Sequence, residues 1–555
     1  MISIMCPAFT TGLSGARRWS GLWEKYFTEF GTLQGEEDMA KEFRYDTDFP
    51  VITTTTGKVH GYEYDHVMIF KGIPYAKAER FRAPEKVSWE GVLEATSYGY
   101  GCPTIEEPVP DHNLDFDRHQ ELKNECCQVM NIWTPGIDAA RRPVLVWLHG
   151  GGMSFGSSSG DGLCEGEEMA RHGDVVVVSF NHRLNILGFC DLSDFGEQFA
   201  NSGNAGVADM VMALEWVRDN IEYFGGDPGN VTLFGQSGGG MKVTTLLQTP
   251  AADRLFHKGI IISGVAGGAM CDCVGSGRQM GKILMRECGV ETAEELAEVP
   301  IGDLMMAARV MRREIKFRGP NAGEFPLRGE YYLGDPLEVS FRAETADIPL
   351  LVGSTFGEFN APKSYGIHKN EMGEAEQEKL VWKTFGEKIA GRGVELFRKA
   401  YPERQVVDLV SMDYMFRNYV NRYMERRTAL NHSTWNYIFN LDMPMMGGVS
   451  PLHGNDLGFI FHTTGKAPAL QEPGITEKVE DQVFRSVIAF ARTGNPNHEG
   501  LPQWDPSSPD AQYTMLFGKC PEVRMNFDVE LNNWMAENLL ADQVQEMMNA
   551  VAGRL

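Results

Sequence analysis

Residues 235–239 read Gly-Gln-Ser-Gly-Gly, and this motif constrains the fold more than any other feature of the chain. The apolar run before it, at 231–234, predicts a strand, and residues 240–247 after it predict a helix. A sharp turn from a strand into a helix holds a serine hydroxyl above the edge of a parallel sheet, where a base can reach it. We therefore expect Ser237 to be a nucleophile in an α/β fold.

The surroundings of the motif identify it, because its spelling is not rare. With 61 glycines among 555 residues, chance supplies about 0.3 copies of Gly-x-Ser-x-Gly at ordinary serine content. The same spelling occurs at 152–156 and at 156–160. Neither of these copies lies between a strand pattern and a helix pattern, so the context selects Ser237.

From residue 143 onward, apolar strand patterns alternate with amphipathic helix patterns. The expected strands cover residues 144–148, 175–178, 231–234, 259–262, 349–352 and 435–441. The clearest helix covers 207–224, where apolar residues recur three and four positions apart, and it stops at the Gly-Gly-Asp-Pro of 225–228. This alternation predicts a mainly parallel central sheet that helices cover on both faces.

Additional segments flank or interrupt this alternating pattern. Residues 57–61 and 67–70 predict an antiparallel hairpin before the parallel part. Residues 361–430 have a charged, helical pattern between two core strands, which predicts a helical insertion. We expect residues 1–45 to form an N-terminal extension and residues 46–555 to form a single domain.

Charge and cysteine content argue against several classes of function. The net charge of −25 argues against binding to nucleic acid and to anionic membrane surfaces. No apolar stretch approaches the roughly 20 residues that span a bilayer, and no basic residue precedes the apolar N-terminus, so a secretory signal is not expected. Ten cysteines without zinc-type spacing predict reduced thiols in a cytoplasmic protein. We expect no metal and no cofactor.

Two side chains are candidates to activate Ser237, since a serine nucleophile needs an adjacent base. His453 lies in the glycine- and proline-containing loop 447–454, after an expected strand, where such sheets place their chemistry. Glu358 lies just past the strand at 349–352 and could orient the imidazole. A structural loop histidine and a solvated surface glutamate are the alternatives for these two residues. The order serine, carboxylate, histidine is the one expected for this architecture.

A glycine loop follows the expected strand at 144–148. Residues 149–152 read His-Gly-Gly-Gly, and three consecutive glycines allow backbone N–H groups to point into one site. The amides of Gly151, Gly152 and Gly238 are the expected donors to an oxyanion, each worth roughly 3–4 kcal/mol of transition-state stabilisation. A phosphate-binding loop is the alternative, but no Gly-Lys-Ser/Thr follows, and no Gly-x-Gly-x-x-Gly with a trailing acid occurs.

Taken in order along the chain, these motifs resemble those of the type B carboxylesterases, the carboxylesterase/cholinesterase-like family of the α/β-hydrolase fold. The resemblance covers roughly residues 50–530 and is strongest to bacterial para-nitrobenzyl-esterase-like members. It rests on residues 72–76, 80–81, 131–135, 149–152, 181–184, 203–206, 224–228, 234–239 and 353–358, on His453 with Asp456, and on 490–496. The site residues that it implies are the catalytic triad Ser237, Glu358 and His453 and the oxyanion-hole glycines Gly151, Gly152 and Gly238.

The resemblance also implies two structural pairs outside the triad. Arg80 and Glu125 match an ion pair of the family. Cys127 matches a cysteine that pairs with one near Cys102 in secreted relatives, and a cytoplasmic location would leave this pair reduced.

The chain departs from the family pattern at three places. The residue before the nucleophile is Gln236, where the family often has glutamate. The acid lies in Phe-Gly-Glu-Phe at 356–359, where the family usually has Asp-Glu-Gly. The segment from Cys102 to Cys127 lacks the tryptophan whose π face binds a cation in cholinesterases, so we do not expect a cholinesterase.

The expected function is hydrolysis of carboxylic esters through a covalent acyl-enzyme, with a small-molecule ester as the partner. A lipase for long-chain esters is one alternative, but residues 106–117 are acidic, whereas a lipase lid is apolar. A non-catalytic interaction protein of the same fold is another, although adhesion members lose the nucleophile or the histidine. Amide hydrolysis, acyl transfer, the physiological ester and the oligomeric state are left open.

Overall fold

The computed structural model describes residues 41–105, 121–265, 277–316, 324–360 and 366–553. By its internal contacts the chain separates into two units, Met1–Glu42 and Phe43–Leu555. The expected N-terminal extension lies almost wholly outside the described residues, as does the acidic stretch at 106–117. The division of the chain into an extension and a single domain therefore stays a prediction.

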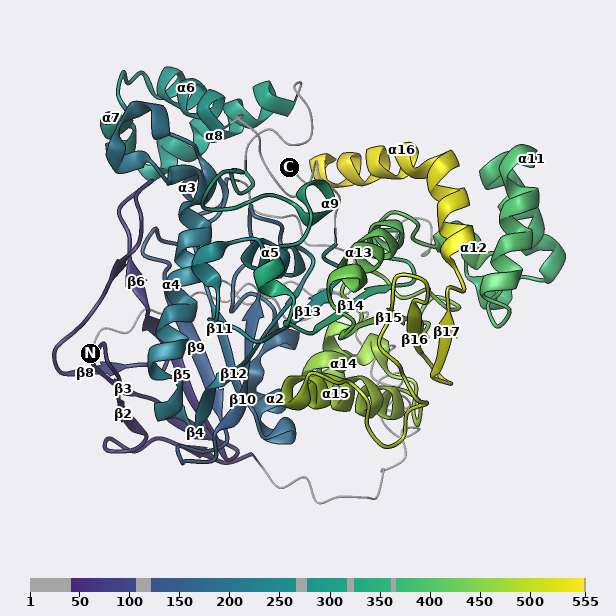
Figure 1. Cartoon of the computed structure of the whole chain (residues 1–555), viewed down its shortest axis with the longest axis horizontal. Coiled ribbons are helices and arrows are strands. Elements are labelled where there is room, and N and C mark those ends of the chain that lie inside the picture. Colours follow the sequence, from purple (N-terminus) through teal and green to yellow (C-terminus); the bar gives the residue numbers. More distant parts are fainter. Residues whose placement is uncertain (1–40, 106–120, 266–276, 317–323, 361–365, 554–555) are drawn as a thin grey trace, which may run out of the picture. The chain divides into compact units, whose positions relative to one another are not determined.

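A central sheet of 12 strands organises the described part of Phe43–Leu555, as Figure 1 shows. In spatial order its strands are β1 (Phe43–Arg44), β4 (Tyr62–Tyr64), β5 (Val67–Pro74), β9 (Val129–Thr134), β11 (Val176–Phe180), β10 (Arg142–Leu148), β12 (Gly226–Gln236), β13 (Lys258–Ile262), β14 (Leu350–Thr355), β15 (Thr434–Phe439), β16 (Tyr513–Phe517) and β17 (Glu522–Met525). Neighbouring strands from β11 to β16 pair in parallel. The strands on both flanks pair antiparallel. The expected α/β-hydrolase sheet is thus confirmed.

Successive side chains of a strand point to opposite faces, and β10 shows how this builds two cores. Val144 and Val146 lie in the core that contains apolar residues of α4 (Ala205–Asn220) and α5 (Gly238–Leu247). Leu145 and Trp147 lie in a second core with apolar residues of α14 (Leu457–Phe461) and α15 (Thr476–Thr493). A strand buried on both faces must be apolar throughout, which explains the continuous apolar runs of the sequence.

The remaining helices cover the faces and ends of the sheet. They are α2 (Gly166–Gly173), α3 (Asn185–Phe189), α6 (Gly277–Cys288), α7 (Ala293–Glu298), α8 (Ile301–Lys316), α9 (Pro336–Val339), α11 (Glu374–Ala400), α12 (Asp408–Ser411), α13 (Phe416–Leu430) and α16 (Val529–Gly553). In Figure 1, α6, α7 and α8 gather at one end of the molecule and α11 lies at the other. The helices α11 to α13 lie between β14 and β15 in the chain, in the segment where an insertion was expected.

The expected N-terminal hairpin has a different partner strand. Strand β3 (Lys58–His60) lies in a separate small sheet with β2 (Val51–Thr53) and β8 (Val92–Glu94), whereas β6 (Ala76–Lys77) pairs with β7 (Glu85–Lys86). Strand β5 instead pairs with β4. The two residues between them, Asp65 and His66, have φ values of 48° and 65°. Two positive φ values give the tight turn that suits a hairpin, although Asp-His is not the usual sequence of such a turn. The predicted pairing of 57–61 with 67–70 was wrong, because 67–70 pairs with β4.

Candidate active site

Ser237 lies at a sharp turn between β12 and α5. Its backbone has φ 57° and ψ −124°, and its N–H donates to the Ile262 carbonyl oxygen on β13 at 2.9 Å. A Cβ on Gly239 would lie 1.9 Å from the Leu148 carbonyl oxygen, and one on Gly235 would lie 2.4 Å from the Gly239 carbonyl carbon. Only glycine fits at these two positions, so the motif is required by the close approach of β12, α5 and the end of β10.

The glycine loop after β10 packs directly against this turn. Gly151 and Gly152 have φ values of +85° and +60°, and a Cβ on Gly238 would lie 2.3 Å from the Gly152 nitrogen. The Gly151 carbonyl oxygen accepts hydrogen bonds from Ser154 N at 3.2 Å and Phe155 N at 3.1 Å. Because C=O and N–H of one trans peptide point in opposite directions, these bonds turn the Gly152 N–H away from the loop. The amides of Gly152 and Gly238 therefore lie beside one another next to Ser237.

Glu358 is completely buried, and both of its carboxylate oxygens have partners. Oε1 accepts hydrogen bonds from Ser263 Oγ and from the Thr355 backbone N–H, each at 2.7 Å. Oε2 accepts a hydrogen bond from Nδ1 of His453. The alternative of a solvated surface glutamate at this position is thus wrong.

His453 is held to Glu358 by its backbone as well as by its ring. The His453 N–H donates to the Glu358 carbonyl oxygen at 3.0 Å. A carboxylate can only accept, so Nδ1 carries a ring proton, and in the neutral imidazole Nε2 then carries the lone pair. Nε2 is buried and has no hydrogen-bond partner within the described residues. This arrangement leaves one unprotonated imidazole nitrogen available as a base.

Two further buried acids lie near Glu358. Burial, followed by the charge of Glu358, raises the pKa of Asp413 and the pKa of Asp456 to about 7. Asp456 accepts a hydrogen bond from the Tyr437 hydroxyl at 3.0 Å. Below this pH both acids are mainly neutral, which limits the negative charge that the site must bury beside Glu358.

Aromatic side chains cover one side of His453. The Phe359 ring stacks on the imidazole at a centroid distance of 4.0 Å and an angle of 30°, and the Phe416 ring lies 5.7 Å away. Tyr419 of α13 and Leu540 of α16 pack in the same cluster. Phe359 follows the acid directly in the sequence and was noticed only as a departure from the family. The other members come from distant segments, and no local pattern marked them.

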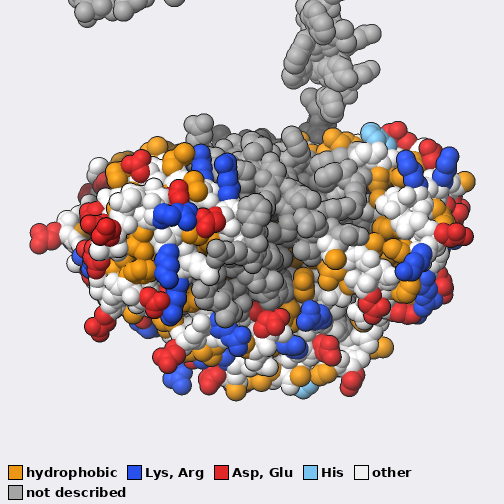
Figure 2. Space-filling view, turned by 90° about the horizontal axis from the view of Figure 1, so that it is seen from above, with side chains coloured by type: hydrophobic (Ala, Val, Ile, Leu, Met, Phe, Trp, Pro, Cys, Tyr) orange, Lys and Arg blue, Asp and Glu red, His pale blue; other side chains and the backbone are white. Residues whose placement is uncertain are grey.

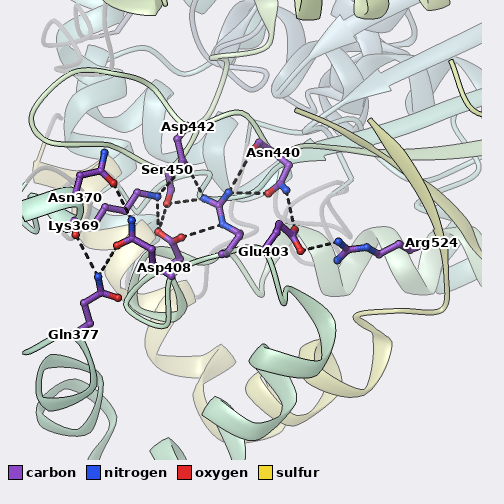
Figure 3. A network of polar contacts seen from close by, with 11 residues as sticks. Lys369, Asn370, Gln377, Glu403, Asp408, Asn440, Asp442, Ser450 and Arg524 are labelled. Carbon is purple, nitrogen blue, oxygen red and sulfur yellow. Dashed lines mark hydrogen bonds and ion pairs between the residues drawn. The ribbon is translucent and has the colours of Figure 1, made fainter. Parts of the chain in front are cut away.

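A network of buried ions anchors the segment that leads from β15 to His453, as Figure 3 shows. Lys369 Nζ lies 2.7 Å from carboxylate oxygens of both Asp408 and Asp442. Arg404 lies 2.6 Å from Asp442 and donates to Ser450 Oγ at 3.1 Å. Asp442 and Ser450 belong to the segment after β15, whereas Lys369 lies just before α11, Arg404 lies between α11 and α12, and Asp408 is the first residue of α12. The network thus fastens this segment to the helices between β14 and β15.

The resemblance also implies two structural pairs outside the triad, Arg80 with Glu125 and Cys102 with Cys127. Arg80 Nε donates to Glu125 at 2.7 Å, so the implied ion pair forms. Cys102 and Cys127 are both buried and carry free thiols. A hydrogen bond with Cys102, together with burial, raises the pKa of Cys127 well above its usual value.

Three further observations bear on the possible partners of the protein. No group of three His, Cys, Asp or Glu side chains within the described residues is placed to hold a metal ion. No helix in the part of the chain that the structure describes is both long and apolar enough to cross a membrane. Figure 2 shows acidic and basic side chains interspersed over one face of the molecule.

Comparisons with known proteins point to one family. The profile of the carboxylesterase family matches residues 48–534. The para-nitrobenzyl esterase of Bacillus subtilis (strain 168) is 32% identical over 86% of this chain and 96% of its own length. The phenmedipham hydrolase of Pseudarthrobacter oxydans is 30% identical over 84% of this chain and 95% of its own. Among solved structures, an esterase from anaerobic Clostridium hathewayi, described as able to hydrolyze aliphatic aromatic polyesters, superposes with a TM-score of 0.86 at 42% identity, covering 90% of this chain and 100% of that one.

Proposed function

The chain belongs to the carboxylesterase family and is a carboxylic ester hydrolase, and on this premise we propose that Ser237, His453 and Glu358 form its catalytic triad. The buried hydrogen bond between Glu358 and His453 supports this assignment most directly. A carboxylate that accepts the Nδ1 proton holds the imidazole in the tautomer that a general base needs. The strained turn at Ser237, with one glycine loop packed against it, supports the role of nucleophile.

In the proposed mechanism, Nε2 of His453 removes the proton of Ser237 Oγ while that oxygen attacks the ester carbonyl carbon. The carbonyl oxygen becomes an anion, and the amides of Gly151, Gly152 and Gly238 donate hydrogen bonds to it. The imidazolium then gives its proton to the leaving alcohol, which departs and leaves an acyl-enzyme. Water repeats the same steps on the acyl-enzyme and releases the acid.

The aromatic cluster beside His453 supports small-molecule esters that carry an aromatic ring as substrates. Phe359 and Phe416 place ring faces next to the imidazole, and aromatic groups pack well against such rings. The structural relative from Clostridium hathewayi is described as acting on aliphatic aromatic polyesters.

A series of p-nitrophenyl esters tests the proposed function. Rates are measured from acetate to palmitate and with benzoate, for the wild type, Ser237→Ala and Glu358→Gln. We expect turnover of the short esters and of the benzoate, a loss on the order of 10⁶-fold in kcat for Ser237→Ala, and a loss of up to about 10⁴-fold for Glu358→Gln. Undiminished hydrolysis by Ser237→Ala would refute the triad, and activity only on emulsified long-chain esters would indicate a lipase.

A cytoplasmic, bacterial setting is the second part of the proposal. Cysteines in the described part of the chain carry free thiols, which suits a reducing compartment. The curated relatives from Bacillus subtilis and Pseudarthrobacter oxydans support a bacterial source. Thiol titration of denatured protein that was purified without reductant should recover every cysteine as a thiol, and recovery of a disulfide between Cys102 and Cys127 would contradict this setting.

A further inference from the structure

Lys242 is a buried cation one turn after the candidate nucleophile. It lies on α5, the helix that begins directly after Ser237, and its side chain is completely buried. No carboxylate lies within ion-pair distance of its Nζ among the residues that the structure describes. Burial lowers the pKa of Lys242 from its usual value to about 7. An uncompensated buried ammonium is costly, so its presence calls for a physical reason.

The Lys242 side chain ends on the backbone of the glycine loop. Its Nζ donates to the His149 carbonyl oxygen at 2.7 Å. His149 is the residue at which β10 passes into the loop, and its ring Nδ1 donates in turn to the Gly150 carbonyl oxygen at 2.8 Å. The carbonyl of Gly150 and the N–H of Gly151 belong to one trans peptide and point in opposite directions. Fixing the two carbonyls therefore fixes the directions of the Gly150 and Gly151 N–H groups.

A second histidine completes the surroundings of Lys242. His182, after β11, stacks on His149 at a centroid distance of 5.3 Å, and its Nδ1 donates to the Arg183 carbonyl oxygen at 2.8 Å. Burial, and then the charge of Lys242, lower the pKa of both histidines well below the usual value. Both rings are therefore neutral, with the proton on Nδ1, which is the tautomer that the hydrogen bond to Gly150 requires.

We propose that Lys242 is a positioning residue of the oxyanion loop, which holds the His149 carbonyl so that the loop amides are directed at the oxyanion. This inference rests on the proposed function of Ser237 and Gly151. Lys242 is completely buried and acts through His149, whose carbonyl oxygen accepts its hydrogen bond and whose ring Nδ1 lies 3.5 Å from its Nζ. A methionine of similar length would fill the same space and remove the buried charge, but it could not donate to the carbonyl.

The proposal predicts that activity and stability change in opposite directions in Lys242→Met. Without the Lys242 donor the loop loses its orientation, so kcat for p-nitrophenyl acetate should fall about 10- to 100-fold. KM should stay within about two-fold, because the ground state does not use the oxyanion hole. The inhibition constant of a trifluoromethyl ketone, which forms a tetrahedral oxyanion on the serine, should rise by the same factor as kcat falls. The melting temperature should rise, because a buried charge is removed.

The pH dependence of this gain in melting temperature is a second readout of the buried charge of Lys242. A group whose folded-state pKa is lowered contributes stability above its unfolded pKa and loses it as pH falls toward the folded pKa. The wild type should therefore be penalised more at pH 7 than at pH 10. The gain in melting temperature for Lys242→Met should accordingly be larger at pH 7 than at pH 10.

A second buried lysine provides the matched control. Lys258 of β13 is 8% exposed, and burial lowers its pKa to about 8. It donates to Asn230, which lies near the start of β12, whereas Ser237 follows the end of β12. Lys258→Met should keep the wild-type kcat and inhibitor affinity. If Lys242→Met does not fold, Lys242→Leu, which also lacks an N–H donor, is measured in the same way.

Two outcomes overturn the inference. One is a kcat and an inhibitor affinity of the Lys242 variant that both stay within two-fold of the wild type. The other is a fall in kcat that is matched by Lys258→Met or that leaves inhibitor affinity unchanged. Ser237→Ala is measured in the same series, and its retention of activity would refute the proposed triad whatever the Lys242 variants do.

Discussion

Gly238 shows how much the site depends on the absence of a single methyl group. A Cβ at this position would lie 2.3 Å from the nitrogen of Gly152, well inside van der Waals contact. The Gly152 amide and the first amide of α5 can share one site only because Gly238 carries no side chain. The close approach of the oxyanion loop to α5 therefore depends on the absence of one carbon atom, the Cβ of residue 238.

Gly238→Ala is expected to push the Gly152 amide away from the oxyanion and to lower kcat by about 10- to 100-fold. KM for a short p-nitrophenyl ester should change little, because the displaced amide binds only the tetrahedral state. Steady-state kinetics measure both constants. Gly302→Ala is the control, since Gly302 lies on α8 with open space around it. Equal kcat for Gly238→Ala and the wild type would mean that the loop tolerates the methyl group.

At the scale of elements, the segment between β15 and His453 has little regular structure of its own. It is fastened by ions that come from the helices between β14 and β15. Asp408 of α12 is 1% exposed and lies 2.7 Å from Lys369, 3.3 Å from Arg404 and 3.2 Å from Ser450 Oγ. These helices therefore help to position the base of the proposed triad in addition to covering the sheet.

Asp408→Asn is expected to lower the free energy of unfolding by up to about 3 kcal/mol, because it removes one of the two carboxylates that pair with the buried Lys369 and Arg404 and leaves only Asp442. Urea unfolding measures this loss, and kcat should fall with it as His453 loses its support. Arg392→Met removes exposed ion pairs with Glu395 and Glu530 and should cost about 1 kcal/mol or less. Similar losses in the two variants would show that the network is no more important than a surface pair.

At the scale of the whole molecule, the fold buries several titratable groups near one end of the parallel strands. Burial disfavours the charged form of each of these groups. Burial lowers the pKa of Lys242 to about 7, and burial with the charge of Glu358 raises the pKa of Asp413 and of Asp456 to about 7. The two large cores on either side of the sheet stabilise the fold enough to hold these groups in place.

The stability of Asp456→Asn relative to the wild type is expected to depend on pH. A carboxyl with a raised folded-state pKa stabilises the fold fully below its unfolded pKa, and this contribution is lost as pH rises toward about 7. The difference in unfolding free energy should therefore shift in favour of the variant between pH 4 and pH 7 and then level off. Urea unfolding at several pH values measures this difference. A difference independent of pH would mean that Asp456 is ionised throughout this range.

Much of the fold and most of the candidate site follow from local patterns. The strands of the parallel sheet other than β16 were predicted because strands buried on both faces must be apolar throughout. Ser237 was predicted because the strand before it, the helix after it and the flanking glycines all lie within residues 231–247. The helix expected at 207–224 forms as α4 with a short turn after it, and it ends at Gly225 with φ 78°. Periodicity and turn chemistry act over short distances, so the sequence alone determines them.

Contacts between distant segments were decided only by the tertiary structure. The hairpin of β4 and β5 depends on a turn whose residues, Asp65 and His66, are not typical of it. Glu358 is a buried, hydrogen-bonded acid because the fold brings Ser263 and His453 to it from distant segments of the chain. Lys242 meets His149 across 93 positions of the chain. No local pattern encodes such a meeting, because its geometry is set by the packing of the whole sheet and its helices.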